Sequence, residues 1–162
     1  MIGGLLTGRV DSADIKIGSV DMQKAVNECN AGKEAKKGLT KEAEKLQHLI
    51  AEKQRELQEM KESLEKQGLM LNPEAKEARE KELQGKVRDF QRWGEDVQNE
   101  VNQKRIETER NISSGLIKIV QEIGANEGYA LILEKNENIV LFASKPTDIT
   151  DQVIKAYDVQ KK

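Results

Sequence analysis

The residue types that could do chemistry are few in this sequence. Cys29 is the only cysteine and His48 the only histidine among the 162 residues. A single thiol excludes an intrachain disulfide and a thiolate metal cluster. A single imidazole leaves little from which to build a histidine metal site or a Ser-His triad. We expect Cys29, which lies near Ala25 and Val26, to be a small buried hydrophobic residue and His48 to lie on a helix surface.

The glycines near the N-terminus raise a second chemical candidate. Gly3 and Gly8 have the spacing of a phosphate-binding loop, but Arg9 and Val10 follow where the motif requires Lys and Ser or Thr. We therefore expect no nucleotide site. The acidic residues follow solvated helix faces and form no convergent set. Together these observations predict no catalytic residues, no metal and no cofactor, so an enzyme is the least favoured class.

Composition and charge exclude further classes. Charged residues make up 35% of the chain and aromatic residues only 3%, and the net charge is −2. Mixed charge of this kind favours long solvated helices and argues against a nucleic-acid partner. No apolar run approaches the roughly 18 residues of a membrane span, and the charge gives no indication of membrane contact. Residues 1–14 lack a basic region before their apolar piece, so we expect a tail left from a signal peptide or added for expression.

The elements that position the remaining side chains begin with a helical hairpin. Two stretches carry apolar residues at alternating steps of four and three, the spacing of a coiled-coil seam. Between them, we expect Gly68 to end the first helix in the left-handed conformation and Pro73 to begin the second, capped by Asn72. The hairpin is an arm over 33–110 with its tip near 68–74. The first seam is Leu39, Ala43, Leu46, Ile50, Lys53, Leu57, Met60 and Leu64; the second is Leu83, Val87, Phe90, Gly94, Val97, Val101, Lys104 and Thr108.

The two ends of the chain predict a body made of 15–32 and 111–162. Strand patterns occupy 15–20, 129–134 and 139–144, with "KNEN" as the turn between the last two. A helix follows its cap Asp21, and a closing helix is capped by Thr147 or Asp148. The second arm helix continues with one buried face, made by Ile112, Leu116, Ile119 and Ile123 and broadened by Ile117 and Val120. The fold class is therefore α+β, and the small sheet has open edges that favour association of subunits.

These residues resemble the Skp (OmpH-like) family of periplasmic chaperones. The likeness covers nearly all of 15–159. "IKIGSVDMQKAVNECNAGKEAKKGL" is similar to the opening strand and helix of the family, and "EGYALILEKNENIVLFASKPTDITDQVIKAY" to its closing strands, with Asp148-Ile149-Thr150 at its DIT position. The charged middle is not specific, because any coiled coil would match it.

The resemblance implies a homotrimer with a shared β-rich body and three helical arms around a cavity. Such a protein holds unfolded outer-membrane β-barrel proteins in the periplasm without ATP and prevents their aggregation. The chain departs from the strongly basic charge of well-known members, with a pI of about 5.7, so we transfer no lipopolysaccharide site. The residues expected in the trimer body are Ile15, Ile17, Val20, Leu131, Leu133, Val140 and Phe142.

The tip of the hairpin carries the main candidate for client binding. Leu69, Met70 and Leu71 stand beside a chain reversal that needs only Gly, Asn and Pro. They are flexible apolar contacts for a client or a cap whose side chains pack on each other, and both can hold because a loosely capped tip can open. Further client-binding candidates are Met60, Leu64, Phe90 and Trp93. The alternative for the whole protein is a structural coiled-coil spacer or adaptor without a client cavity.

Overall fold

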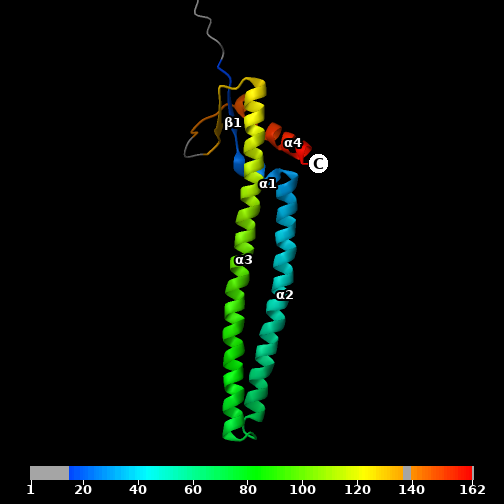
Figure 1. The fold of residues 1–162 in the computed structure, drawn as a ribbon, viewed down its shortest axis with the longest axis vertical. Helices are drawn as coiled ribbons and strands as arrows, with labels where there is room; N and C mark the ends of the chain where they lie inside the picture. The colour runs from blue at the N-terminus through cyan, green and yellow to red at the C-terminus, as the bar shows by residue number, and fades with distance from the viewer. Residues whose placement is uncertain (1–14, 137–139, 162) are drawn as a thin grey trace, which may run out of the picture. The chain divides into compact units, whose positions relative to one another are not determined.

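The computed structural model describes residues 15–136 and 140–161 (Figure 1). The predicted tail over 1–14 lies outside the described residues. The chain divides into two compact units. We call Asn30–Ile112 the arm, and we call the described residues up to Cys29 together with those from Ser113 onward the body.

The arm contains two long helices, α2 (Asn30–Gln67) and the first part of α3 (Pro73–Glu127). The predicted restart at Pro73 is confirmed, because the Asn72 Oδ1 accepts a hydrogen bond from the backbone N–H of Ala75 at 2.7 Å. This is the bond by which an N-cap residue satisfies one of the free donors at a helix start. The helix α3 continues without a break past the end of the arm, and its last turns belong to the body.

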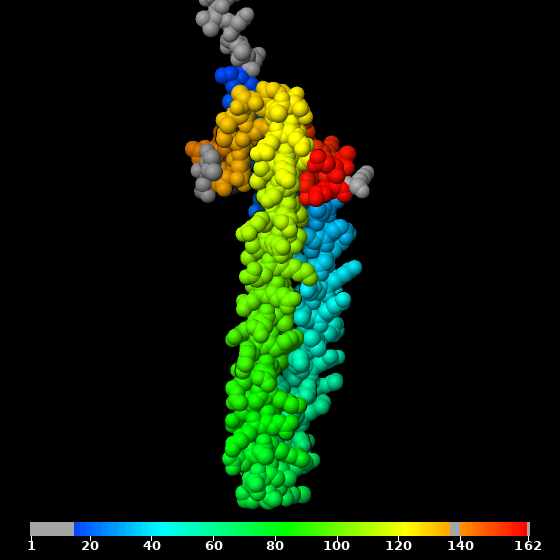
Figure 2. All heavy atoms as spheres, viewed as in Figure 1, coloured from blue at the N-terminus to red at the C-terminus, as the bar shows by residue number. Residues whose placement is uncertain are grey.

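The two helices of the arm pair in antiparallel directions. Figures 1 and 2 show α2 and α3 side by side along the length of the arm. Polar bonds across the pair connect the end of α2 to the start of α3, and residues progressively earlier in α2 to residues progressively later in α3, which antiparallel pairing requires. These bonds join Gln67 to Arg79 at 3.1 Å, Glu56 to Lys86 at 3.1 Å and Glu42 to Lys104 at 2.8 Å.

The seam of the arm is narrow, and α2 contains no fully buried residue. Most predicted seam residues are half-buried, but Ala43, Val87 and Lys104 are exposed. At the first of these positions the prediction was wrong, since Glu42 is half-buried in place of Ala43. An α-helix of 3.6 residues per turn drifts against a strict 3.5-residue repeat. The drift brings Glu42 to the side that faces α3, where it pairs with Lys104.

The turn at the tip requires Gly68 because of a close backbone contact, and not because of a left-handed conformation. Among the described residues, the only glycine with positive φ is Gly128 at 70°, so the prediction of a left-handed Gly68 was wrong. The Gly68 N–H donates to the Leu64 carbonyl at 2.8 Å. A Cβ atom on Gly68 would lie 2.4 Å from that same oxygen. Glycine is therefore required by a close approach of backbone atoms.

The body is built on two parallel strands, β1 (Ile17–Val20) and β2 (Leu131–Glu134). In their register Ile17 lies opposite Leu131, and Val20 lies opposite Glu134. The helix α1 (Met22–Glu28) follows β1 and begins where predicted, with Asp21 Oδ1 accepting from the Lys24 N–H at 2.7 Å.

The core of the body comes from both ends of the chain. The predicted burial of Cys29, Leu116, Ile119 and Ile123 is confirmed, but the prediction that Ile117 lies on the buried face is wrong, because its side chain is 47% exposed. The ring of Tyr157 packs so closely on α3 that a Cβ on Gly115 would lie 2.6 Å from its Cε2 atom. The buried apolar residues of the body are Val20, Ala25, Cys29, Leu116, Ile119, Ile123, Ile149, Val153 and Tyr157.

The predicted strand over 139–144 is wrong for its described residues. Residues 140–144 form no strand, and a short 3₁₀ helix η1 (Lys145–Thr147) leads from them into α4 (Thr150–Gln160). β2 pairs with β1, and the other side of β1 is occupied where the Ser19 carbonyl accepts from the Ile149 N–H at 2.9 Å. Within the described residues β1 and β2 pair only with each other, and residues 140–144 do not join the free edge of β2. The predicted turn over 135–138 falls partly outside the described residues.

Asp148 organises the start of α4. Its Oδ1 accepts from the Thr150 N–H at 3.0 Å and from the Thr150 hydroxyl at 2.5 Å, and its Oδ2 pairs with Lys135 at 2.9 Å. The Thr150 Oγ1 in turn accepts from the Asp21 N–H at 2.9 Å. The N-cap position itself is Ile149, so the prediction of Thr147 or Asp148 is wrong in position, although the Asp148 carboxylate does bind the first helical N–H.

Burial by itself would raise the pKa of Asp148, but the hydrogen bonds from Thr150 and the charge of Lys135 outweigh it and lower the pKa from 3.8 to about 2. A carboxyl whose pKa is lower in the folded chain stabilises that state above its unfolded pKa. We therefore expect this stabilisation to be complete above pH 3.8 and to disappear as the pH falls through about 2.

The variant Asp148→Asn should lower the free energy of unfolding at pH 7 by on the order of 1–2 kcal/mol, a value reduced for the partial exposure of the carboxylate. The difference between the variant and the unaltered chain should shrink between pH 3.8 and about 2. Urea unfolding at several pH values measures it. Asp151→Asn is the control. The Asp151 side chain, which pairs with Lys24, is 75% exposed, so its replacement should change stability by less than about 0.5 kcal/mol. Equal effects of the two variants would contradict the role given to Asp148.

Because the core of the body lies outside the arm, deleting residues 41–107 and joining the ends by a short Gly/Ser turn should leave a folded body. Circular dichroism should show helix content, and thermal unfolding should remain cooperative. A truncated chain without helix signal or without a cooperative transition would show that the arm contributes to the core.

Candidate functional site

The tip of the arm exposes two large apolar side chains. Leu69 is 93% exposed and Met70 is 91% exposed, whereas Leu71 is half-buried. Since Leu69 and Met70 gain almost no burial from each other, the interpretation of these two residues as a packed hairpin cap is wrong. Only the half-buried Leu71 fits the interpretation as a hairpin cap. The alternative interpretation, contact with another molecule, is the one that their exposure supports.

A cleft with an aromatic wall lies between α2 and α3. It has a volume of about 320 Å³. The Phe90 and Trp93 rings stack with their centroids 6.0 Å apart at 28°, and the Lys53 Nζ lies 5.3 Å from the centroid of the Trp93 ring. We call this the aromatic cleft; its lining residues are Lys53, Glu56, Leu57, Lys86, Asp89, Phe90 and Trp93.

The charges around the aromatic cleft are unequally neutralised. The Lys86 ammonium pairs with Glu56 at 3.1 Å, and the Asp89 carboxylate pairs with Arg92 at 3.8 Å. Among the described residues, no carboxylate lies within ion-pair distance of the Lys53 ammonium. The cleft therefore combines two aromatic rings with one positive charge that the arm does not neutralise.

A second cleft lies nearer the tip. It has a volume of about 420 Å³, and we call it the acidic cleft. Its apolar contribution comes from Met60, Leu64 and Leu83, and carboxylates surround it. The lining residues are Glu56, Glu59, Met60, Ser63, Leu64, Arg79, Glu82 and Leu83.

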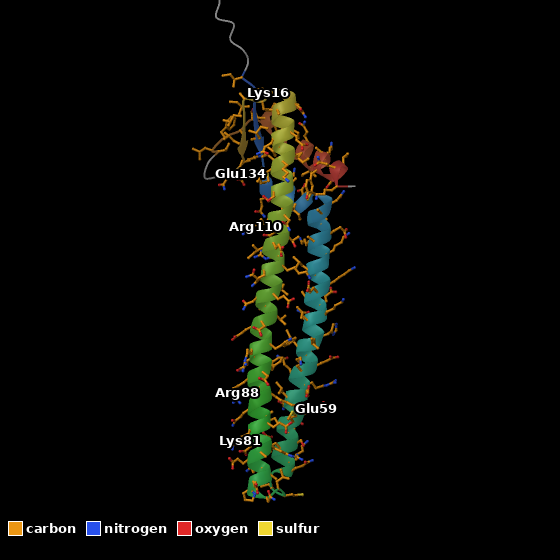
Figure 3. The ribbon with its side chains drawn as sticks, viewed as in Figure 1. Lys16, Glu59, Lys81, Arg88, Arg110 and Glu134 are labelled. Carbon is orange, nitrogen blue, oxygen red and sulfur yellow. The ribbon has the colours of Figure 1, made fainter. Side chains whose placement is uncertain are left out.

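The two clefts lie on one face of the arm. Glu56 lines both of them. On α3, the lining residues Arg79, Glu82, Lys86 and Asp89 follow each other at steps of three and four, and residues at this spacing share one side of a helix. Figure 3 shows Glu59 on α2, and it shows Lys81 and Arg88 on the side of α3 that is turned away from α2. The arm thus presents a grooved apolar strip between charged margins.

The predicted client-binding residues fall at three places within the arm. Leu69 and Met70 lie at the tip, Met60 and Leu64 line the acidic cleft, and Phe90 and Trp93 line the aromatic cleft. Sequence reasoning missed Lys53, Leu57 and Leu83 as lining residues. The signal for Lys53 is its charge at a position of an otherwise apolar seam.

The residues predicted to lie in the trimer body differ in how far they are buried. Val20 is 3% exposed, so it contributes to the core of its own chain. Val140 is half-buried. Leu141, which was not predicted, is as exposed as its neighbour Phe142. The exposed apolar residues of the sheet region are Ile15, Ile17, Leu131, Leu133, Leu141 and Phe142.

Within residues 15–136 and 140–161, no helix has both the length and the apolar character needed to cross a membrane. In the same ranges, no group of three or more His, Cys, Asp or Glu side chains is arranged to hold a metal ion.

Comparison with known proteins finds similarity over nearly the whole chain. The family described as "Outer membrane protein (OmpH-like)" matches residues 16–157. An uncharacterised protein of Aquifex aeolicus (strain VF5) is 31% identical over 147 residues, which cover 91% of this chain and 88% of that protein. A crystal structure of a candidate outer membrane chaperone (OmpH-like) from Caulobacter crescentus CB15 superposes with a TM-score of 0.84. It is 20% identical and covers 90% of this chain and 85% of that one, so it shows the same fold.

Proposed function

Because the chain belongs to the OmpH-like family, we propose that it is a chaperone that holds unfolded outer-membrane β-barrel proteins and prevents their aggregation in the periplasm. It acts without ATP and without catalysis. Three copies associate through their bodies, and clients are held between the arms.

The observation that carries this proposal is the exposure of Leu69 and Met70 at the tip. Burying a large apolar side chain contributes about 1.5–3 kcal/mol, so two exposed ones side by side favour binding of an apolar segment of another molecule. An unfolded β-barrel protein has such segments, because its lipid-facing residues are apolar and are not yet covered. Methionine suits this use, since its unbranched side chain adapts to many surfaces.

Weak contacts repeated on several arms explain how such a protein can both hold and release a client. Each contact breaks easily by itself, but linked contacts raise the overall affinity by orders of magnitude. The charged surface around the clefts keeps the arms soluble, and opposite charges along each helix neutralise one another at i, i+3 and i, i+4 spacing, as in the pairs Lys81–Glu77 and Arg105–Glu109.

The exposed apolar residues of the body support association of subunits. Leu141 is 92% exposed and Phe142 is 86% exposed, beside a sheet of only two strands. A sheet this small has open edges and little buried area. A second and third copy would cover both the edges and these side chains.

The double variant Leu69→Ser with Met70→Ser tests client holding. Its affinity for an unfolded β-barrel protein should fall at least tenfold, which requires a loss of only about 1.4 kcal/mol. Affinity is measured by fluorescence anisotropy of a labelled client diluted from urea. The melting temperature should stay within about 2 °C, because the substituted side chains are exposed.

The matched control is Lys61→Ser with Glu65→Ser, which removes two exposed side chains near the tip without removing apolar surface. The control should hold the client as the unaltered chain does. An unchanged affinity of the tip variant would contradict the proposed client contact and favour a spacer protein.

Association is tested by light scattering, which should give the mass of three chains. Leu141→Ser with Phe142→Ser should shift the mass toward one chain, because it removes apolar surface at the proposed interface. The tip variant should retain the mass of three chains and serves as the control. A monodisperse monomer of the unaltered chain at micromolar concentration would refute the trimer.

A further inference from the structure

We propose that the aromatic cleft is a subsite for one kind of client segment, an aromatic side chain adjacent to a carboxylate. The inference rests on the proposed holding function, and it adds a preference for a local sequence to it. Every residue that carries it lies within the arm.

The aromatic half of the preference follows from the two rings. The Phe90 and Trp93 rings stack at 28° and stand half-exposed at the cleft. Stacked or edge-on arrangements of aromatic rings with centroids about 4.5–7 Å apart contribute more than burial of their area alone. A third ring can extend this stack, whereas an aliphatic side chain gains only the area that it buries.

The acidic half of the preference follows from Lys53. Its ammonium lies over the Trp93 ring and, among the described residues, forms no ion pair with a carboxylate. The other cation of the cleft, Lys86, is already paired with Glu56. A client carboxylate beside the ring would therefore find one available positive charge. The long flexible stem of Lys53 allows the ammonium to turn toward it while the methylenes still cover the indole.

The neighbouring acidic cleft restricts where that carboxylate can lie. Glu59 pairs with Arg55 at 3.5 Å, but no cation among the described residues lies within ion-pair distance of Glu82. The Arg79 guanidinium also lines this cleft, where it donates to the Gln67 side chain at 3.1 Å and, within the described part of the chain, pairs with no carboxylate. A client carboxylate placed there would meet charges of both signs, Arg79 and Glu82, whereas Lys53 offers a positive charge directly beside the rings. Repulsion by Glu82 therefore offsets the attraction of Arg79, and the aromatic cleft is the favoured position.

The size of the aromatic cleft is consistent with this occupant. Its volume of about 320 Å³ lies at the lower end of ligand-sized sites, which span roughly 300–1,000 Å³. It has room for one aromatic side chain and its neighbour, and not for a folded element.

The test uses the full chain and three blocked peptides, Ac-Gly-Phe-Asp-Gly-Gly-NH2, Ac-Gly-Phe-Lys-Gly-Gly-NH2 and Ac-Gly-Leu-Asp-Gly-Gly-NH2. Trp93 is the only tryptophan of the chain, and the peptides contain none, so its emission reports on the cleft alone. The peptides are titrated to about 10 mM. The Phe-Asp peptide should bind at least about fivefold more tightly than either of the others.

The variant Lys53→Gln should abolish the preference for Phe-Asp over Phe-Lys and keep the helix content of the unaltered chain. Lys61→Gln is the matched control, because it removes one charge from the same helix outside both clefts. The control should keep the preference. A structural role of Lys53 alone would change the melting temperature without changing the ranking of the peptides.

Three outcomes would overturn the inference. They are the absence of peptide binding up to the highest concentration, equal binding of the Phe-Asp and Leu-Asp peptides, and equal loss of preference in the two lysine variants. Suppression of client aggregation by the unaltered chain is measured in parallel. If suppression persists while the peptide preference is absent, only the subsite is refuted; if suppression is absent, the proposed function itself is refuted.

Discussion

The parallel pairing of β1 with β2 is the interaction on which the rest of the structure depends. Parallel neighbours require a crossover connection, and here the crossover is the whole sequence between Val20 and Leu131. A flexible connection of this length would lose entropy when its ends meet. Two long helices folded back on each other reduce that loss, because the chain returns in the direction from which it came. The contact of Asp21 with Thr150 then joins segments from both ends of the chain in one body, and the contact of Asp148 with Lys135 joins two segments of its C-terminal part.

The narrow seam of the arm explains why this unit offers binding surface at all. A helix pair with a wide apolar stripe would bury its large residues completely, whereas α2 buries none. Half-buried side chains such as Leu57 and Met60 stabilise the pair and still line clefts. Incomplete burial also lowers the stability that each of these residues contributes, because the hydrophobic free energy scales with the apolar area removed from water. Stability of the arm and surface for a client are thus two uses of the same side chains.

Several features were predictable from sequence because they depend on neighbours along the chain. The caps at Asp21 and Asn72, the restart at Pro73 and the buried positions of Leu116 and Ile119 follow from local hydrogen bonding and helical periodicity. The predictions were wrong where contacts with another helix decide which of two adjacent residues faces inward. Glu42 faces α3 in place of Ala43, and it pairs there with Lys104 of that helix.

By itself, the sequence determined the α+β class, the helical hairpin with its turn between Gly68 and Pro73, and the apolar residues available at the tip and in the seam. These follow from residue types and spacing, which act over a few positions. Only the tertiary structure decided that Leu69 and Met70 are uncovered, that residues 140–144 form no strand, and that Lys53 meets the Trp93 ring. Each of these depends on which distant segment lies alongside. Burial, ladder pairing and charge neutralisation are properties of contacts between segments, so no single stretch of sequence carries them.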